Sequence, residues 1–209
     1  MSRPNNPKLE AALKYAAAGW PVFPLHTPGG IQGKPCSCNR EDCESIGKHP
    51  RTMNGKDGAT TDEATIREWW RLWPKANIGG ITGPKSGRWA LDVDPRNGGD
   101  KTLAALLAEH GDLPRTQKQR TGGGGDHHIF EWPDNFTGKL AASIGRGLDI
   151  KGDGGYIVLP PSTHDSGEKY QWADSVPPNV APQWLWDLAK KSQSKKTASV
   201  TTHWPAGQE

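Results

Sequence analysis

The sequence has no long hydrophobic run, since no stretch approaches the roughly 18 consecutive apolar residues that a membrane-spanning helix requires. Its first residues, Met1-Ser2-Arg3-Pro4, also lack the apolar segment of a secretory signal peptide. These two absences lead us to expect a cytoplasmic protein that has no membrane partner.

A large net charge is also missing. The chain has 26 Lys and Arg against 23 Asp and Glu, and residues 190–209 hold four of those lysines but only one of the acids. The rest of the chain is therefore neutral overall. Any binding of nucleic acid must depend on local basic patches rather than on bulk charge.

Apolar residues are scarce as well, at 33% of a chain that has 26 Gly and 18 Pro. Ten Trp compensate, because each aromatic side chain buries a large area. The length of 209 residues suits one domain or two tightly joined lobes. Residues 191–209 are rich in Lys, Ser and Thr, a composition typical of a flexible linker, so we place the folded domain at residues 1–190.

Apolar periodicity and the positions of Gly and Pro predict helices and strands without a regular β-α-β alternation, so we expect an α+β fold. Thr60 and Glu63 fit a capping box at the start of the second helix. Tyr170 and Trp172 alternate on a short strand, where core packing is favoured over base stacking. The predicted helices are 7–18, 62–73, 102–110 and 183–190, and the other predicted strands are 20–25, 77–82, 89–94, 116–121, 127–132, 147–151 and 155–159.

Two acids lie close together on one predicted strand. Asp92 and Asp94 are two residues apart and share a face, whereas Leu91 and Val93 point to the other face. Two like charges on one face of a buried strand are destabilising unless cations neutralise them, and hard divalent cations prefer such oxygen ligands. The alternative is a strand end whose acids face solvent and cap the following turn.

A third acid, Asp149, lies between apolar residues on another predicted strand. Alone it is an ordinary exposed strand residue. Together with Asp92 and Asp94 it could hold two metal ions about 3.5–4 Å apart, the arrangement that supports in-line phosphoryl transfer.

Four consecutive glycines, residues 122–125, precede the strand that begins at His127. Glycine lets backbone N–H groups approach an anion closely, and a histidine ring can donate hydrogen bonds to phosphate oxygens. Alternation places His127 and His128 on opposite faces, so only one of them can face the site. The alternative is a long flexible hairpin.

All three cysteines, Cys36, Cys38 and Cys43, fall within eight residues, and His49 follows. Three thiolates and one imidazole form a closed tetrahedral zinc site, and a disulfide would leave one cysteine over. We therefore expect one structural zinc ion in a loop of about residues 33–52, with free thiols or another fourth ligand as alternatives. The zinc would order the loop and present Lys34, Arg40, Lys48 and Arg51 to a template or nucleotide.

The order of these elements resembles the bifunctional primase-polymerase family of the archaeo-eukaryotic primase superfamily. Asp92-x-Asp94, Gly125-x-His127 and Asp149 followed by residues 152–162 occur in the family's order, and the similarity covers most of residues 9–190. The segments that resemble the family elsewhere are 17–25, 47–51, 77–79 and 167–172. One departure is Gly125, where the family often has Ser.

The resemblance implies a fold with a recognition-motif-like β-sheet and a second α/β unit, with the active site in the cleft between them. It implies a DNA primase and polymerase of phage or plasmid type, in the host cytoplasm if a phage encodes it. Asp92, Asp94 and Asp149 would bind two catalytic Mg²⁺ or Mn²⁺ ions. We expect nucleotide contacts from His127, Gly124, Gly125, Lys151, Asn77 and Ser162.

The expected substrates are a single-stranded DNA template and ribo- or deoxynucleoside triphosphates, and a helicase domain is expected beyond the C-terminus. Two rival readings remain open. A metal-dependent nuclease would use the same carboxylates without needing nucleotides, and a zinc-stabilised single-strand-binding module would bind DNA with or without divalent metal.

Overall fold

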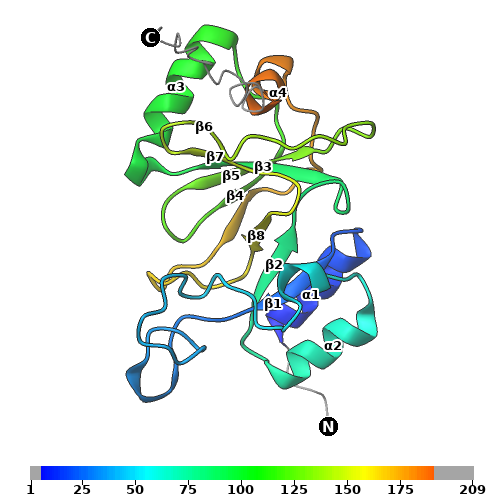
Figure 1. Ribbon diagram of the computed structural model, residues 1–209, viewed down its shortest axis with the longest axis vertical. Helices are drawn as coiled ribbons and strands as arrows, with labels where there is room; N and C mark the ends of the chain where they lie inside the picture. The colour runs from blue at the N-terminus through cyan, green and yellow to red at the C-terminus, as the bar shows by residue number, and fades with distance from the viewer. Residues whose placement is uncertain (1–5, 191–209) are drawn as a thin grey trace, which may run out of the picture.

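The computed structural model describes residues 6–190, which form two antiparallel sheets and four α-helices (Figure 1). The larger sheet has the strand order β6-β7-β3-β5-β4-β9. Its strands are β3 (Arg88–Val93), β4 (Gln117–Arg120), β5 (Asp126–Glu131), β6 (Ser143–Gly145), β7 (Leu148–Lys151) and β9 (Gln171–Asp174). This architecture confirms the predicted α+β class.

The smaller sheet has three strands in the order β1-β2-β8 and is covered by two helices. Its strands are β1 (Val22–Leu25), β2 (Asn77–Ile81) and β8 (Tyr156–Leu159), and the helices are α1 (Pro7–Ala17) and α2 (Glu63–Leu72). Buried side chains of α1 and α2, such as Ala12, Ile66 and Trp70, pack against Ile78 and Leu159 of this sheet. The helical spacing of the tryptophans in α2 thus reflects core packing.

The two faces of the larger sheet have different neighbours. Trp89, Leu91 and Phe130 point to one face, where α4 (Gln183–Lys190) packs through Leu185, and α3 (Gly99–His110) covers the same side (Figure 1). On the opposite face Ala90 and Ile129 join the core of the smaller sheet. One face of the larger sheet is therefore turned toward the smaller sheet, and the polar residues of that face lie between the two.

The segment between β1 and α2 contains no long regular element. It holds two short 3-10 helices, η1 (Ile31–Gly33) and η2 (Gly55–Gly58), and another, η3 (Pro95–Asn97), follows β3. Within residues 6–190, none of the helices has the length and apolar character needed to cross a membrane.

The predicted capping box at the start of α2 is wrong. The N-terminal cap is Asp62, whose carboxylate accepts a hydrogen bond from the backbone N–H of Thr65 at 2.7 Å. Thr60 lies outside the helix and accepts from the N–H of Asp62 at 3.0 Å. The closer residue takes the cap because its side chain reaches the N3 amide directly.

Candidate active site

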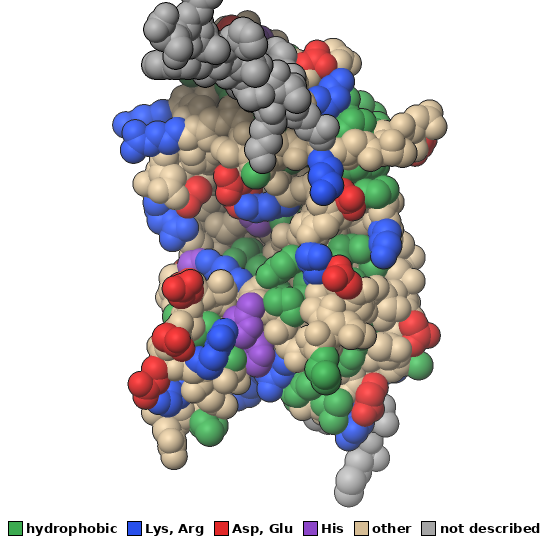
Figure 2. Space-filling model, viewed as in Figure 1, with side chains coloured by type: hydrophobic (Ala, Val, Ile, Leu, Met, Phe, Trp, Pro, Cys, Tyr) green, Lys and Arg blue, Asp and Glu red, His purple; other side chains and the backbone are tan. Residues whose placement is uncertain are grey.

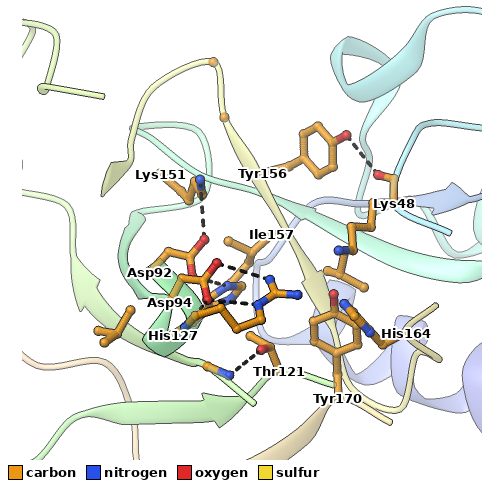
Figure 3. Close-up of a pocket in the computed structure, with 16 residues that line it drawn as sticks. Lys48, Asp92, Asp94, Thr121, His127, Lys151, Tyr156, Ile157, His164 and Tyr170 are labelled. Atoms are coloured by element: carbon orange, nitrogen blue, oxygen red, sulfur yellow. Dashed lines mark hydrogen bonds and ion pairs between the residues drawn. The ribbon is translucent and has the colours of Figure 1, made fainter. Parts of the chain in front are cut away.

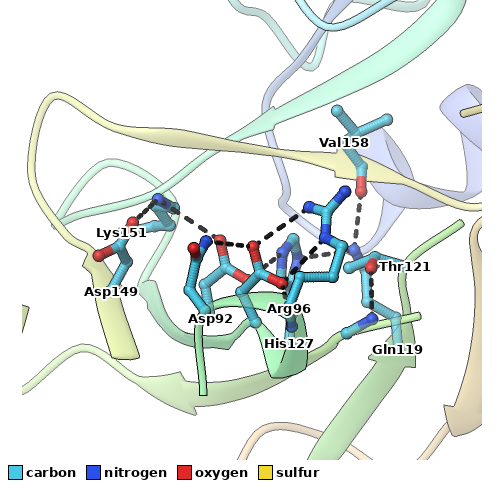
Figure 4. A network of polar contacts seen from close by, with 11 residues as sticks. Asp92, Arg96, Gln119, Thr121, His127, Asp149, Lys151 and Val158 are labelled. Atoms are coloured by element: carbon cyan, nitrogen blue, oxygen red, sulfur yellow. Dashed lines mark hydrogen bonds and ion pairs between the residues drawn. The ribbon is translucent and has the colours of Figure 1, made fainter. Parts of the chain in front are cut away.

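Three polar residues on adjacent strands of the larger sheet lie directly opposite one another. Asp92 of β3 pairs with His127 of β5 on one side and with Asp149 of β7 on the other. Residues opposite each other in antiparallel strands point to the same face. Strand register therefore brings together three residues that are far apart in the sequence, on the face turned toward the smaller sheet (Figure 4).

This face borders a cavity of about 430 Å³ that both sheets line (Figure 3). In the space-filling view the surface is hollowed between the parts built on the two sheets, with charged and histidine side chains along the hollow (Figure 2). The polar lining comes from strands of both sheets and from the segments between them: Lys48, Asp92, Asp94, Arg96, Thr121, His127, Lys151, Tyr156, His164 and Tyr170.

Asp92 is the most enclosed of the three predicted catalytic carboxylates. Burial raises its pKa, but the hydrogen bond from His127 and the charge of Lys151 outweigh burial, so its pKa lies below the usual value. Its Oδ1 lies 3.3 Å from Nε2 of His127, and its Oδ2 lies 3.5 Å from Nζ of Lys151. Asp92 is therefore an anion held within the cavity wall.

Asp94 follows the end of β3 and caps η3. It accepts hydrogen bonds from the backbone N–H of Arg96 at 3.0 Å, from the Arg96 guanidinium at 3.1 Å and from Nδ2 of Asn97 at 2.9 Å. These hydrogen bonds, chiefly those from Arg96, lower the pKa of Asp94. Its carboxylate lines the cavity beside Asp92, so both acids of the predicted pair face the same space.

Asp149 is not among the residues that line the cavity, and its side chain is 53% exposed. Lys151 bridges it to Asp92, with Nζ 3.1 Å from Oδ2 of Asp149. Among residues 6–190 the three carboxylates do not form a group whose ligand atoms all lie within 4.8 Å of one another. Lys151 and Arg96 compensate their charge, and the oxygen donors themselves are of the kind that hard divalent cations prefer.

The two neighbouring histidines point to opposite sides of β5. His127 is 6% exposed and faces the cavity, with Nδ1 2.8 Å from Nε2 of Gln119. His128 lies opposite Leu91, on the side of α3 and α4. Burial, and next the charge of Lys118, lower the pKa of His128 to about 4. His127 is thus the histidine that the structure places in the candidate site.

The four glycines form a tight hairpin turn between β4 and β5 rather than an open loop. The N–H of Gly124 donates to the carbonyl of Thr121 at 3.0 Å, and that of Gly125 donates to the Thr121 hydroxyl at 3.0 Å. The two amides predicted to contact a nucleotide are therefore engaged within the turn. In the described part of the chain, the N–H groups of Gly122 and Gly123 have no acceptor.

Asn77 and Ser162 do not line the cavity. Both are fully buried, and Asn77 donates to the carbonyls of Gly47 and Thr163 and accepts from the N–H of Thr163. The hydroxyl of Ser162 accepts from the N–H of Ile78 at 2.9 Å. Their polar atoms are used to join segments of the fold, so we do not retain them as nucleotide contacts.

The cysteine cluster forms a potential metal site. The ligand atoms of Cys36, Cys38, Cys43 and His49 all lie within 4.8 Å of one another. Slight burial raises the pKa of the Cys38 thiol, but hydrogen bonds from Arg40 and from the other two cysteines outweigh it and lower that pKa to about 6. Three thiols and an imidazole are a ligand set of structural zinc sites, and their close spacing fits one zinc ion.

The cysteine loop also reaches the cavity. Lys48, which immediately precedes His49, lines the cavity, and its carbonyl accepts a hydrogen bond from the hydroxyl of Tyr156 at 2.9 Å. Asn77 holds the preceding carbonyl of Gly47 at 2.9 Å. The smaller sheet thus fixes the end of the loop that delivers a lysine to the candidate site.

Sequence reasoning did not find several residues of the site. Arg96 is part of no distinctive motif, although its position two residues after Asp94 in a short turn could have indicated that it pairs with that carboxylate. Gln119 lies three residues before the glycine run, and His164 follows Ser162 by two residues, but neither has a distinctive pattern. These residues meet the carboxylates only through pairing of distant strands and loops.

Comparison with known families covers most of the described chain. A family model described as "Bifunctional DNA primase/polymerase, N-terminal" matches residues 12–184. The matched region includes both sheets, the cysteine cluster and the cavity residues above. No curated protein matches the sequence.

Proposed function

The chain belongs to the family of bifunctional DNA primase/polymerase N-terminal domains, and we propose on that basis that it synthesises and extends primers in phage or plasmid replication. The reaction is attack of a 3′-hydroxyl on the α-phosphate of a nucleoside triphosphate, directed by a single-stranded DNA template, with release of pyrophosphate. The observation that supports it best is the row formed by Asp149, Asp92 and His127 beside a cavity large enough for a nucleotide.

We assign Asp92, Asp94 and Asp149 to the binding of two Mg²⁺ or Mn²⁺ ions. Asp92 and Asp94 line the cavity, and Asp149 is the exposed cross-strand partner of Asp92. When bound, such ions lower the barrier by activating the attacking hydroxyl and stabilising the leaving oxygens. Lys151 and Arg96, which pair with these carboxylates, line the same cavity and would contact the phosphates of a bound nucleotide.

Basic and hydrogen-bonding groups around the carboxylates suit a triphosphate. Lys48, Arg96, His127 and His164 border the same cavity, and Lys151 lies beside Asp92. Charge-assisted hydrogen bonds to phosphate are among the strong ones in proteins. In our assignment the backbone N–H groups of Gly122 and Gly123, rather than those of Gly124 and Gly125, contact the phosphates of the nucleotide.

We assign a structural zinc ion to Cys36, Cys38, Cys43 and His49. This ion would hold the loop whose end contributes Lys48 to the cavity. A cytoplasmic location and a helicase domain following the C-terminus complete the proposal, and the residues after 190 lie outside the described part of the chain.

The test is incorporation of labelled nucleotides on a single-stranded template with Mg²⁺ or Mn²⁺, resolved on a denaturing gel. Asp92→Asn should abolish synthesis, whereas Asp112→Asn, a change at an exposed acid outside the site, should not. Cleavage of the template without nucleotides would identify a nuclease instead. Metal-independent DNA binding without synthesis would identify a binding module.

A further inference from the structure

The ring of His127 is held from both sides. Gln119 of β4 lies directly opposite it in the strand register, with the Gln119 side-chain nitrogen 2.8 Å from Nδ1 of His127. On the other side, Nε2 of His127 lies 3.3 Å from Oδ1 of Asp92. Gln119 is fully buried, so water does not compete for this contact (Figure 4).

A third group fixes the orientation of the Gln119 amide. Its nitrogen also lies 2.7 Å from the backbone carbonyl of Val158 in β8. A carbonyl oxygen only accepts hydrogen bonds, so the amide must present its NH₂ group there. The rotated amide would bring two oxygens together. One N–H therefore points to Val158 and the other to His127.

The tautomer of His127 follows from this geometry. Because Gln119 donates to Nδ1, that nitrogen must accept, and the hydrogen of the neutral ring is on Nε2. We infer that Gln119 is a positioning residue that fixes His127 as a hydrogen-bond donor through Nε2, toward Asp92 in the free protein and toward the phosphates when a nucleotide is bound. The catalytic part of this inference rests on the proposed function, whereas the tautomer does not.

The opposite tautomer would disable the contact. With its hydrogen on Nδ1, the ring would present the lone pair of Nε2 to a phosphate oxygen, which also carries lone pairs. Loss of a hydrogen bond to a charged group lowers kcat/KM about tenfold to a hundredfold. The effect of Gln119 on the reaction is therefore transmitted through His127 rather than through contact with substrate.

The first test needs no variant. Two-bond ¹H–¹⁵N NMR correlations of histidine-labelled protein in mildly alkaline buffer distinguish the two neutral tautomers. The His127 signals are assigned by their absence in His127→Gln. We expect hydrogen on Nε2 in the free protein. Hydrogen on Nδ1 would overturn the inference, whatever the enzymatic activity.

The second test reverses the donor. Gln119→Glu places an acceptor next to Nδ1, so Nδ1 should gain a hydrogen and kcat/KM for nucleotide should fall about tenfold to a hundredfold. Gln117→Glu is the matched control on the same strand, two residues away, and should change neither the tautomer nor kcat/KM. An unchanged tautomer in Gln119→Glu, or an equal loss in both variants, would refute the role.

If Gln119→Glu does not fold, Gln119→Met removes the donor without adding a charge. A mixture of both tautomers is then expected, and a ring that stays entirely in the wild-type tautomer would contradict the inference. A protein with the expected tautomers but no nucleotide incorporation would refute the proposed function and leave the positioning by Gln119 intact.

Discussion

At the scale of single residues, the orientation of β5 decides which of two adjacent histidines can act on a substrate. His127 faces Asp92 and the cavity, and His128 faces the core beneath α3 and α4. His127→Ala should lower kcat/KM for nucleotide about tenfold to a hundredfold, the value of one charge-assisted contact of roughly 1.5–3 kcal/mol. His128→Ala should affect folding stability more than catalysis. Steady-state kinetics that gave the reverse pattern would invalidate the assignment of His127.

His128 should also make stability depend on pH. Its pKa is lowered to about 4 in the folded protein, by burial first and then by Lys118, whereas a free histidine titrates near 6.5. The unfolded chain therefore binds a proton that the folded chain does not as pH falls from about 6.5 to 4, and folding stability decreases over this window. Replacement by His128→Gln should remove up to about 3 kcal/mol of that loss of stability. Denaturant unfolding at several pH values would measure it, and parallel curves for both proteins would contradict it.

Gly125 is a residue-scale constraint of a steric kind. A Cβ atom there would lie 2.5 Å from the carbonyl oxygen of Val93, which is backbone and cannot move aside. Gly125→Ala should therefore cost about 1–3 kcal/mol of stability. Gly123→Ala, in the same turn, meets only side-chain atoms at 3.3 Å or more and is the control. Thermal melts should separate the two variants, and similar melting temperatures would show that the turn adapts.

At the scale of elements, the cysteine loop couples a metal site to the cavity. Cys38→Ser should reduce zinc content from one ion per chain and loosen the loop, measurable by elemental analysis and faster proteolysis within residues 30–56. Because Lys48 lies at the end of this loop and lines the cavity, KM for nucleotide should rise several-fold with a smaller change in kcat. Glu44→Ala, at an exposed position of the same loop, is the comparison. Full activity in a zinc-free protein with three reactive thiols would disprove the link.

Much of the element pattern is predictable from sequence because it depends on local periodicity. The strand that carries Asp92 and the helix that carries Trp70 follow directly from apolar spacing. The short strand β6 (Ser143–Gly145) was not predicted, since three residues have no measurable alternation. The capping residue of α2 was misassigned because two candidates lay two residues apart.

The candidate site was predictable only in part, for a different reason. The spacing of Asp92 and Asp94 indicates a shared face from sequence alone. That Asp149 and His127 flank Asp92 depends on strand order, which local sequence does not encode. Asn77 and Ser162 lie in segments similar to the family, yet their burial shows that such similarity can reflect structural hydrogen bonds.

At the scale of the whole molecule, α4 closes the fold on one side of the larger sheet. Leu185 and Ala189 are fully buried against the strands of that sheet. Truncation after Lys190 should leave nucleotide incorporation intact, with weaker template binding at low salt because Lys191, Lys195 and Lys196 are lost. Truncation after Pro182 should expose the apolar surface under α4 and prevent folding. Gel-based synthesis and circular dichroism would test both, and inactivity of the longer protein at every salt concentration would place the tail within the domain.

The hydrogen bond from the Gln119 side chain to the backbone carbonyl of Val158 joins one sheet to the other. Gln119 belongs to the six-stranded sheet and Val158 to the three-stranded sheet, and the cavity lies where the two face each other. A separation of the sheets would break this hydrogen bond and leave the amide free to rotate. The width of the cleft is thus coupled through Gln119 to the hydrogen-bonding direction of His127. A domain that opened to admit a template would lose the constraint on the tautomer of His127, and closure would restore it.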